Sequence, residues 1–360
     1  MLNLSRKIKS DKGSITSFTL LSMLFFLVVV IAIYASVNTK IQKQEKEIKS
    51  VQDNYKQENI DDIYGNTLNG KAGLLATYVK VGDYVSYEPE ALNEANLNTL
   101  KNNLNTYSGK SDSTINSAIN RDELKWRVLD VNEKTGQVRL ISAEPTSSKI
   151  ELYGYNGYNN AVKLIDGACS TLYNNSKLAS KVQNLKIEDI TRYMTTQPTD
   201  DKSEYTLADI NYPNILKQEK NQTTKESATP ELGISEQYDL VTGNSKSDTI
   251  LKNTYWKQSM NADTSLKEKY YELFIKKQEN YYSEYLISSR CITSSSYSAG
   301  FCIRYISSND VTAFGLCYSS NKEYSISGAL RPIITLNSNV QLDTTKAADG
   351  TQPSTAYEIK

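Results

Sequence analysis

The longest apolar segment of the chain lies close to its N-terminus. Residues 18–37 carry no charged side chain, and the run from Leu24 to Ile31 is entirely apolar. At about 1.5 Å of rise per residue, a helix of this length spans about 30 Å, the thickness of the hydrocarbon core of a bilayer. The segment also lacks the polar stripe that a buried amphipathic helix shows. The pattern therefore predicts a transmembrane anchor over residues 18–37, preceded by a short cytoplasmic tail, residues 1–17.

A cleaved signal peptide is the alternative interpretation of this segment. The apolar region of a signal peptide is about 7–15 residues long and ends in a small-x-small cleavage site, which the sequence from Ile33 to Ala35 does not match. Four basic side chains stand on each side of the span, so the positive-inside rule leaves the orientation open. Since a short tail stays inside more easily than a large domain, we expect a single-pass protein of the cell membrane with its C-terminal domain extracytoplasmic.

The residues after the span alternate in charge and predict a helical stalk over residues 38–65. Ile41, Ile48, Val51 and Tyr55 fall at heptad spacings, but they cover only about two heptads, and a coiled coil needs three or four. We interpret the stalk as a spacer between the bilayer and the outer domain. Weak self-association along the heptad positions is the alternative.

Residues 74–345 show the pattern of a mixed domain, and residues 346–360 are expected to form a C-terminal tail. Residues 82–87 alternate as an edge strand does, and residues 126–131 and 138–142 predict a hairpin. Helical periodicity follows over residues 159–173, 187–194 and 266–277, and short strands return from Tyr285 onward. The order of strands, helices and strands predicts the α+β class rather than a wound parallel sheet.

Composition narrows the function classes. The chain has 360 residues and no histidine, which excludes Ser-His-Asp and Cys-His catalytic sets, His-based metal sites and a histidine pH switch. Its 41 basic and 41 acidic side chains balance, whereas nucleic-acid-binding proteins carry a basic excess. Tyrosine is the one aromatic in surplus, with 26 Tyr against 6 Phe and 2 Trp.

The chain has four cysteines, and none of them forms a C-x-x-C pair, so neither a zinc ribbon nor a thioredoxin-type site is indicated. An even number in an outward-facing chain allows disulfides. Cys291 and Cys302 lie in two candidate strands on either side of a turn-rich segment, and we expect them to form a cross-strand disulfide. The alternative is that all four are small buried apolar residues.

Serine and tyrosine are concentrated near the C-terminus. Residues 285–327 hold 12 Ser and five Tyr, a composition that resembles antibody paratopes, in which tyrosine supplies rigid contact area and serine supplies adaptable hydrogen bonds. The alternatives are ordinary loop filler and the codon bias of an AT-rich genome. The candidate ligand-binding residues are Tyr297, Tyr305, Asn309, Asp310, Tyr318, Asn321 and Tyr324.

The N-terminus resembles the start of a type IV pilin or pseudopilin. The similarity rests on a basic leader that ends at Gly13, the apolar run after it and the charged helix that follows. The family pattern places Glu at the fifth position after that glycine, where this chain has Phe18. A plain signal anchor therefore accounts better for this segment.

The outer domain resembles a domain of unknown function that is common in surface proteins of low-GC Gram-positive bacteria. The matching segments are residues 126–129, 140–142, 157–162, 285–291, 301–306 and 329–336. The resemblance implies a fold like that of C-type lectins or formylglycine-generating enzymes, with ligand-binding loops beside the strand that contains Arg331 and Pro332. A lectin calcium site is not expected, because residues 285–336 contain only Asp310 and Glu323 as carboxylates, while calcium needs about six to eight oxygens. No metal or cofactor is predicted.

We expect a non-catalytic, membrane-anchored protein that binds a glycan, peptide or protein through these loops, which are also candidates for hypervariability. The alternative is a pilin-like or envelope structural component without a specific ligand. The third hypothesis is an enzyme. Glu144, Glu188, Asp189 and Arg331 would then supply acid–base chemistry, although no spacing ties them together.

Overall fold

The structure is a computed structural model. It describes residues 73–132, 134–198, 250–275, 277–278, 281–282, 284–320 and 322–360, together with Met23 and the short strands at 204–206 and 241–242. The chain divides into two compact units, residues 1–70 and 71–360. The predicted anchor (18–37) and stalk (38–65) lie outside the described residues apart from Met23, and among the described residues no helix is long and apolar enough to span a bilayer.

The first of the two large sheets contains six strands in the order β17-β1-β2-β3-β16-β5. Their bounds are Tyr84–Ser86 for β1, Trp126–Asn132 for β2, Gln137–Ser142 for β3, Ala179–Asn184 for β5, Pro332–Leu336 for β16 and Tyr357–Glu358 for β17. The predicted hairpin of β2 and β3 is confirmed. Its turn is set locally, because the side-chain oxygen of Asn132 accepts hydrogen bonds from the backbone of Lys134 and Thr135, and Gly136 takes a positive φ of 68°.

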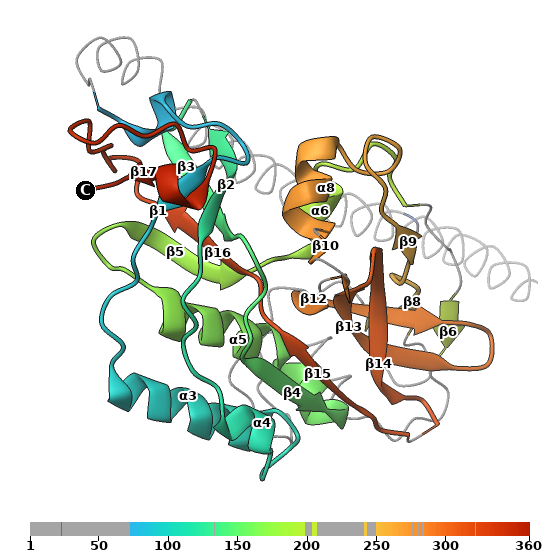
Figure 1. Cartoon of the computed structure of the whole chain (residues 1–360). Helices are drawn as coiled ribbons and strands as arrows, with labels where there is room; N and C mark the ends of the chain where they lie inside the picture. Colours follow the sequence, from blue (N-terminus) through green and yellow to red (C-terminus); the bar gives the residue numbers. More distant parts are fainter. Residues whose placement is uncertain are drawn as a thin grey trace, which may run out of the picture. The chain divides into compact units, whose positions relative to one another are not determined.

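Two expectations for this sheet differ from the structure. Strand β1 is not an edge strand, since it pairs with β2 on one side and with β17 on the other. Residues 346–360, expected to be a separate tail, supply η2 (Pro353–Thr355) and β17, so the C-terminus is part of the outer domain (Figure 1). Two residues of pairing are too short to leave a periodic signal in the sequence.

The second large sheet has the order β4-β15-β12-β13-β14-β9. Its strands are β4 (Lys149–Tyr153), β9 (Gln258–Ser259), β12 (Tyr285–Ser294), β13 (Ala299–Ser307), β14 (Asp310–Tyr318) and β15 (Ser325–Ala329). The return of strands after Tyr285 is confirmed. Two minor groups consist of β10 (Lys277–Gln278) with β11 (Tyr281–Tyr282), and of β6 (Glu204–Thr206), β7 (Val241–Thr242) and β8 (Ile250–Lys252).

Strand β12 lies between two hydrophobic cores. Leu286 and Ile292 belong to the first core, with α5, whereas Tyr285 and Ile287 belong to the second. Nine of its ten residues are buried, and these include polar side chains such as Ser288, Ser289 and Arg290. The domain is thus mixed α+β with two main sheets, and this part of the predicted fold class is confirmed.

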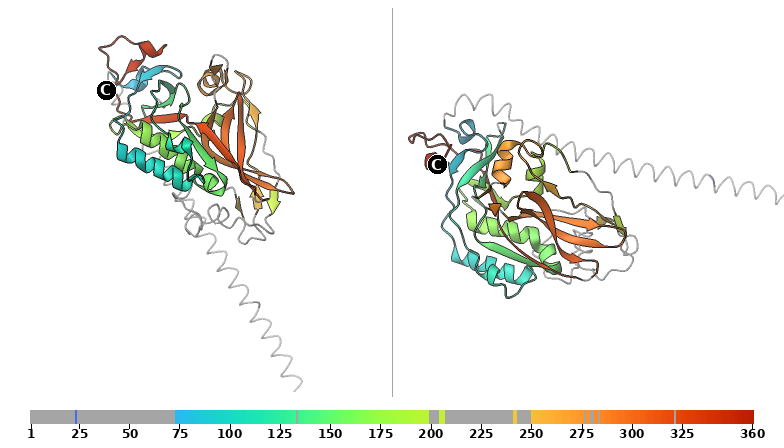
Figure 2. Two further views of the ribbon diagram at one scale, coloured as in Figure 1. Left: turned by 60° about the horizontal axis from the view of Figure 1, so that its bottom comes forward. Right: turned by 45° about the vertical axis from the view of Figure 1, so that its right-hand side comes forward.

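Helix α5 (Gly154–Tyr173) is the central helix of the domain. It packs against strands of both large sheets, and α3 (Glu94–Tyr107) lies along its outer side (Figures 1 and 2). The periodicity predicted the helix from Asn159 to Tyr173, but it begins five residues earlier, at Gly154. Residues 154–158 include two glycines and carry no helical signal of their own. Packing stabilises the start of the helix, since the rings of Tyr158 and Phe301 meet edge to face at 5.3 Å.

The second core is closed by two short helices, α6 (Ile187–Thr191) and α8 (Glu268–Ile275). Both are confirmed in position and are shorter than the periodicity suggested. Ile190, Leu273 and Phe274 pack there against Ile306 and Val311 of the second sheet. The remaining short elements are η1 (Leu75–Thr77) and α4 (Thr114–Ser117).

Candidate functional site

The predicted binding surface is divided between the two ends of the second sheet. Strand β13 runs from the 295–298 turn, which carries Tyr297, to the 308–309 turn, which precedes Asp310. At about 3.4 Å per residue, a strand of this length separates the two turns by about 30 Å. A small ligand therefore cannot contact both. Asn321, another candidate, lies outside the described residues.

Asn309 and Asp310 hold the short strand β9 to β14. The Asp310 carboxylate pairs with Lys257 at 2.8 Å and accepts a hydrogen bond from the Ser259 hydroxyl at 2.5 Å. These two partners keep the pKa of Asp310 below its ordinary value. The Asn309 carbonyl accepts from the backbone N–H of Met260 at 2.8 Å. These groups already have partners, and we assign them a structural role at this edge.

Tyr305 also falls outside a shared site. It is half-buried in the middle of β13, opposite Leu286 and Thr312, and it packs against the first core.

Tyr297, Tyr318 and Tyr324, in contrast, lie at the same end of the sheet. The 295–298 turn and the 318–324 turn are joined by two hydrogen bonds between Ala299 and Ser319, one to the serine hydroxyl and one from its backbone N–H. Tyr297 is 90% exposed and Tyr324 is 43% exposed. We call this end of the domain the tyrosine end. It consists of Tyr297, Tyr318 and Tyr324 with the neighbouring residues Lys110, Tyr153, Tyr155 and Glu323.

The Tyr318 ring is seated on two glycines. A Cβ added at Gly300 would lie 2.8 Å from a carbon of this ring, and a Cβ added at Gly315 would meet its hydroxyl group. The Tyr324 ring packs edge-on against it, with 5.7 Å between ring centroids and 86° between ring planes. The two rings are therefore fixed relative to each other before any ligand binds.

The other members come from distant parts of the sequence and were missed by sequence reasoning. The Glu323 carboxylate accepts a hydrogen bond from the backbone N–H of Tyr155, in the first turn of α5, at 3.2 Å. Burial raises the pKa of Glu323, and a hydrogen bond with the Tyr153 side chain offsets this only in part. The Lys110 ammonium lies 5.6 Å from the centre of the Tyr153 ring. No periodic or motif signal links these residues, because they meet only through tertiary structure.

Glu151 supports this end from below the surface. Its carboxylate accepts hydrogen bonds from the hydroxyls of Ser113 and Ser325, both at 2.6 Å, and it lies 3.8 Å from the Lys110 ammonium. Burial raises the pKa of Glu151, but these hydrogen bonds and the lysine charge outweigh it, so the pKa lies below its ordinary value. The network ties α4, β4 and β15 together under the exposed rings.

Of the four residues considered for acid–base chemistry, Arg331 and Glu144 interact electrostatically, whereas Asp189 pairs with a different residue. Asp189 is paired with Arg139 at 2.6 Å, and Arg331 is buried and donates to the carbonyls of Ala143 and Leu273. Among the described residues, no group of three or more His, Cys, Asp or Glu side chains is arranged to hold a metal ion.

All four cysteines are buried free thiols. Cys291 and Cys302 are direct cross-strand partners in the register of β12 and β13, and their side chains are hydrogen-bonded. This hydrogen bond, together with burial, raises the pKa of Cys302. The register allows the predicted disulfide, which stays a prediction.

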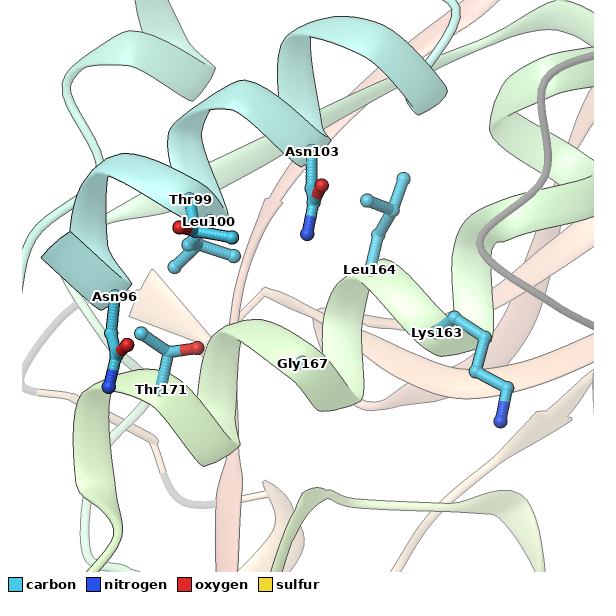
Figure 3. A pocket seen from close by; sticks show the side chains of 8 residues that line it. All are labelled: Asn96, Thr99, Leu100, Asn103, Lys163, Leu164, Gly167 and Thr171. Carbon is cyan, nitrogen blue, oxygen red and sulfur yellow. The ribbon is translucent and has the colours of Figure 1, made fainter.

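A shallow groove of about 140 Å³ lies between α3 and α5 (Figure 3). Half of its eight lining residues carry an amide or hydroxyl group, among them Asn96, Asn103 and Thr171. Gly167 leaves it open, since an added Cβ there would meet no atom within 4 Å. The volume is well below the about 300–1,000 Å³ of usual ligand pockets.

Comparisons of the chain with protein-family models, with curated proteins and with solved structures find no match.

Proposed function

We propose that this chain is a membrane-anchored, extracytoplasmic, non-catalytic protein that binds a ligand or a partner surface through the tyrosine end. The observation that carries the proposal is the distribution of exposed aromatic rings. In the part of the outer domain that the structure describes, the exposed large hydrophobic side chains are Tyr78, Tyr297 and Tyr324, and two of these three belong to the tyrosine end.

Tyrosine suits such a surface because it offers a large contact area and loses little rotamer freedom on binding. The fixed packing of Tyr318 with Tyr324 lowers this cost further, since preorganised groups lose less entropy on association. The surrounding hydroxyls of the 295–298 and 318–324 turns supply hydrogen-bonding groups of both kinds.

The finer fold assignment is part of the same proposal. The mixed α+β architecture with two main sheets is compatible with a C-type-lectin-like domain, and the loops of the tyrosine end then correspond to its ligand-binding loops. The proposed anchor places this domain outside the membrane, where ligands are accessible.

Binding of the full-length chain, reconstituted in lipid nanodiscs, to glycan and peptide arrays tests this function. The double variant Tyr297→Ser/Tyr324→Ser removes the exposed rings, and Tyr78→Ser is the matched control because Tyr78 is exposed to nearly the same degree as Tyr324. Loss of two anchoring rings corresponds to a decrease in affinity of at least about 30-fold, as expected for interface hot spots. The control should bind as the unaltered chain does.

Equal binding by the double variant would contradict the tyrosine end as the binding surface. Crosslinking in intact cells addresses the alternative function. Ladders of this chain alone, linked through residues 18–65, would instead favour an envelope or pilin-like structural component.

A further inference from the structure

A second pocket lies at the other end of α5 from the tyrosine end. It has a volume of about 430 Å³, within the about 300–1,000 Å³ of small-ligand sites. Tyr173, the last residue of α5, lines it, whereas Gly154, the first residue, adjoins the tyrosine end. A helix of this length extends about 30 Å, so the pocket is a separate site.

The floor of the pocket is aromatic and rigid. Tyr87, Trp126 and Tyr173 are all buried, and the tryptophan ring meets the two tyrosine rings edge-on at 5.3 and 5.8 Å. The Tyr87 hydroxyl donates to the Tyr173 carbonyl at 2.8 Å, and the Tyr173 hydroxyl accepts from the backbone N–H of Asp122 at 3.2 Å. Such a preformed apolar floor accommodates an apolar or aromatic group.

The wall carries an arginine with unused donors. The Nε of Arg121 donates to the Leu172 carbonyl at 2.6 Å, which fixes the orientation of the guanidinium. Within the described residues its two terminal nitrogens have no hydrogen-bond or ion-pair partner. The adjacent Asp122 carboxylate accepts hydrogen bonds from the backbone of Ser147 and Ser148 and from the Ser147 hydroxyl instead of from Arg121. A guanidinium with a free fork is suited to bind a carboxylate in a bidentate manner.

The rim carries charge of the opposite sign. Glu88 and Glu123 line the pocket, are exposed and have no side-chain partner among the described residues. Lys125 is the second cation of the lining. A pocket lined by both acidic and basic side chains is complementary to a ligand that carries a positive and a negative group.

We propose that this pocket binds a free α-amino acid with an apolar side chain. The ligand carboxylate pairs with Arg121, its ammonium group pairs with Glu88 or Glu123, and its side chain packs on Trp126 and Leu124. This site does not depend on the proposed function of the tyrosine end.

The test uses the full-length chain in nanodiscs and the intrinsic fluorescence of Trp126. The chain has two tryptophans, so the variant Trp256→Phe makes Trp126 the single reporter. L-Phenylalanine and L-leucine are expected to change the emission saturably at millimolar or lower concentration. L-Serine, N-acetyl-L-phenylalanine and L-phenylalaninamide, which lack the apolar side chain, the ammonium group and the carboxylate respectively, should each bind at least about tenfold more weakly.

Two results would overturn the proposal. One is the absence of any saturable response to L-phenylalanine and L-leucine. The other is equal affinity for either blocked derivative, because charge recognition would then be absent. Arg121→Gln keeps a side-chain donor within reach of the Leu172 carbonyl and should weaken L-phenylalanine binding at least about tenfold. Lys181→Gln, at an exposed position of β5 outside the pocket lining, is the matched control and should bind as the unaltered chain does.

Discussion

The carboxylate of Glu323 occupies the space that a side chain at Gly154 would need. A Cβ added at Gly154 would lie 2.6 Å from the carboxylate carbon of Glu323, and Gly154 has a φ of +56°. The glycine at the start of α5 thus lets a residue from the far end of the chain bind the first turn of the helix. The packing of the central helix and the geometry of the tyrosine end are coupled through this contact.

Gly154→Ala is therefore expected to destabilise the protein by about 1–3 kcal/mol, because alanine is strained at positive φ and also collides with the carboxylate. Chemical denaturation of the Gly154→Ala variant and of the unaltered chain measures the effect. Adding Glu323→Ala to Gly154→Ala removes the collision but not the φ strain, so the double variant should lose less stability than the two single changes added together. Strict additivity would contradict the contact.

The contribution of Glu151 to the stability of the fold is expected to depend on pH. Its pKa is lower in the folded state than the ordinary value of 4.5, so the ionised carboxylate stabilises the fold above that value. This contribution is lost as the pH falls through the folded pKa. Glu151→Gln should lower the free energy of unfolding by about 1–2 kcal/mol at pH 7, because hydrogen bonds to a charged acceptor are weakened.

Denaturation of the Glu151→Gln variant and the unaltered chain at a series of pH values checks this sign. The difference between the two should shrink below pH 4.5. Glu94→Gln, at an exposed residue in the first turn of α3, serves as a control for the loss of a surface carboxylate. A difference that grows on acidification would contradict the assignment.

Alanine substitution is expected to have opposite effects on stability at two glycines of α5. Gly167→Ala should stabilise the protein by about 0.5–1 kcal/mol, because alanine is favoured within helices and its Cβ points into open space in the groove of Figure 3. Gly157→Ala should destabilise it, because the added Cβ would lie 3.0 Å from the Ser108 carbonyl oxygen and 3.2 Å from Leu152. Thermal unfolding of the Gly167→Ala and Gly157→Ala variants checks this contrast. Stability changes of the same sign would show that helix propensity alone determines the effect of alanine.

The cross-strand cysteines give a redox prediction. In chain isolated under oxidising conditions, peptide mapping should find a disulfide between Cys291 and Cys302, with Cys169 and Cys317 as free thiols. Because this bond closes a short loop in the unfolded chain, reduction should cost about 2–3 kcal/mol of stability. The Cys291→Ser/Cys302→Ser variant should show no further change on reduction. A disulfide that includes Cys317 would contradict the pairing.

Local patterns were sufficient for several elements of this protein. The β2–β3 hairpin follows from alternating strands around a turn that Asn132 and Gly136 set by themselves. The part of α5 from Asn159 to Tyr173 follows from its apolar periodicity, and the α+β class follows from the order of the elements. Each of these signals is contained in a short segment, so neighbours along the chain are enough to define it.

The long-range arrangement of the site could not be inferred in this way. Sequence reasoning grouped Tyr297 and Asp310 because they are close in the chain, but an extended strand puts them at opposite ends of a sheet. It missed Glu323, Tyr153 and Lys110, and it missed the pocket around Trp126, because β-sheet pairing joins residues that are far apart in sequence. The sequence by itself thus determined the apolar span, the local elements and the surplus of tyrosine. Only the tertiary structure decided which tyrosines share a surface, because that depends on strand register and on the packing of α5, neither of which a local pattern encodes.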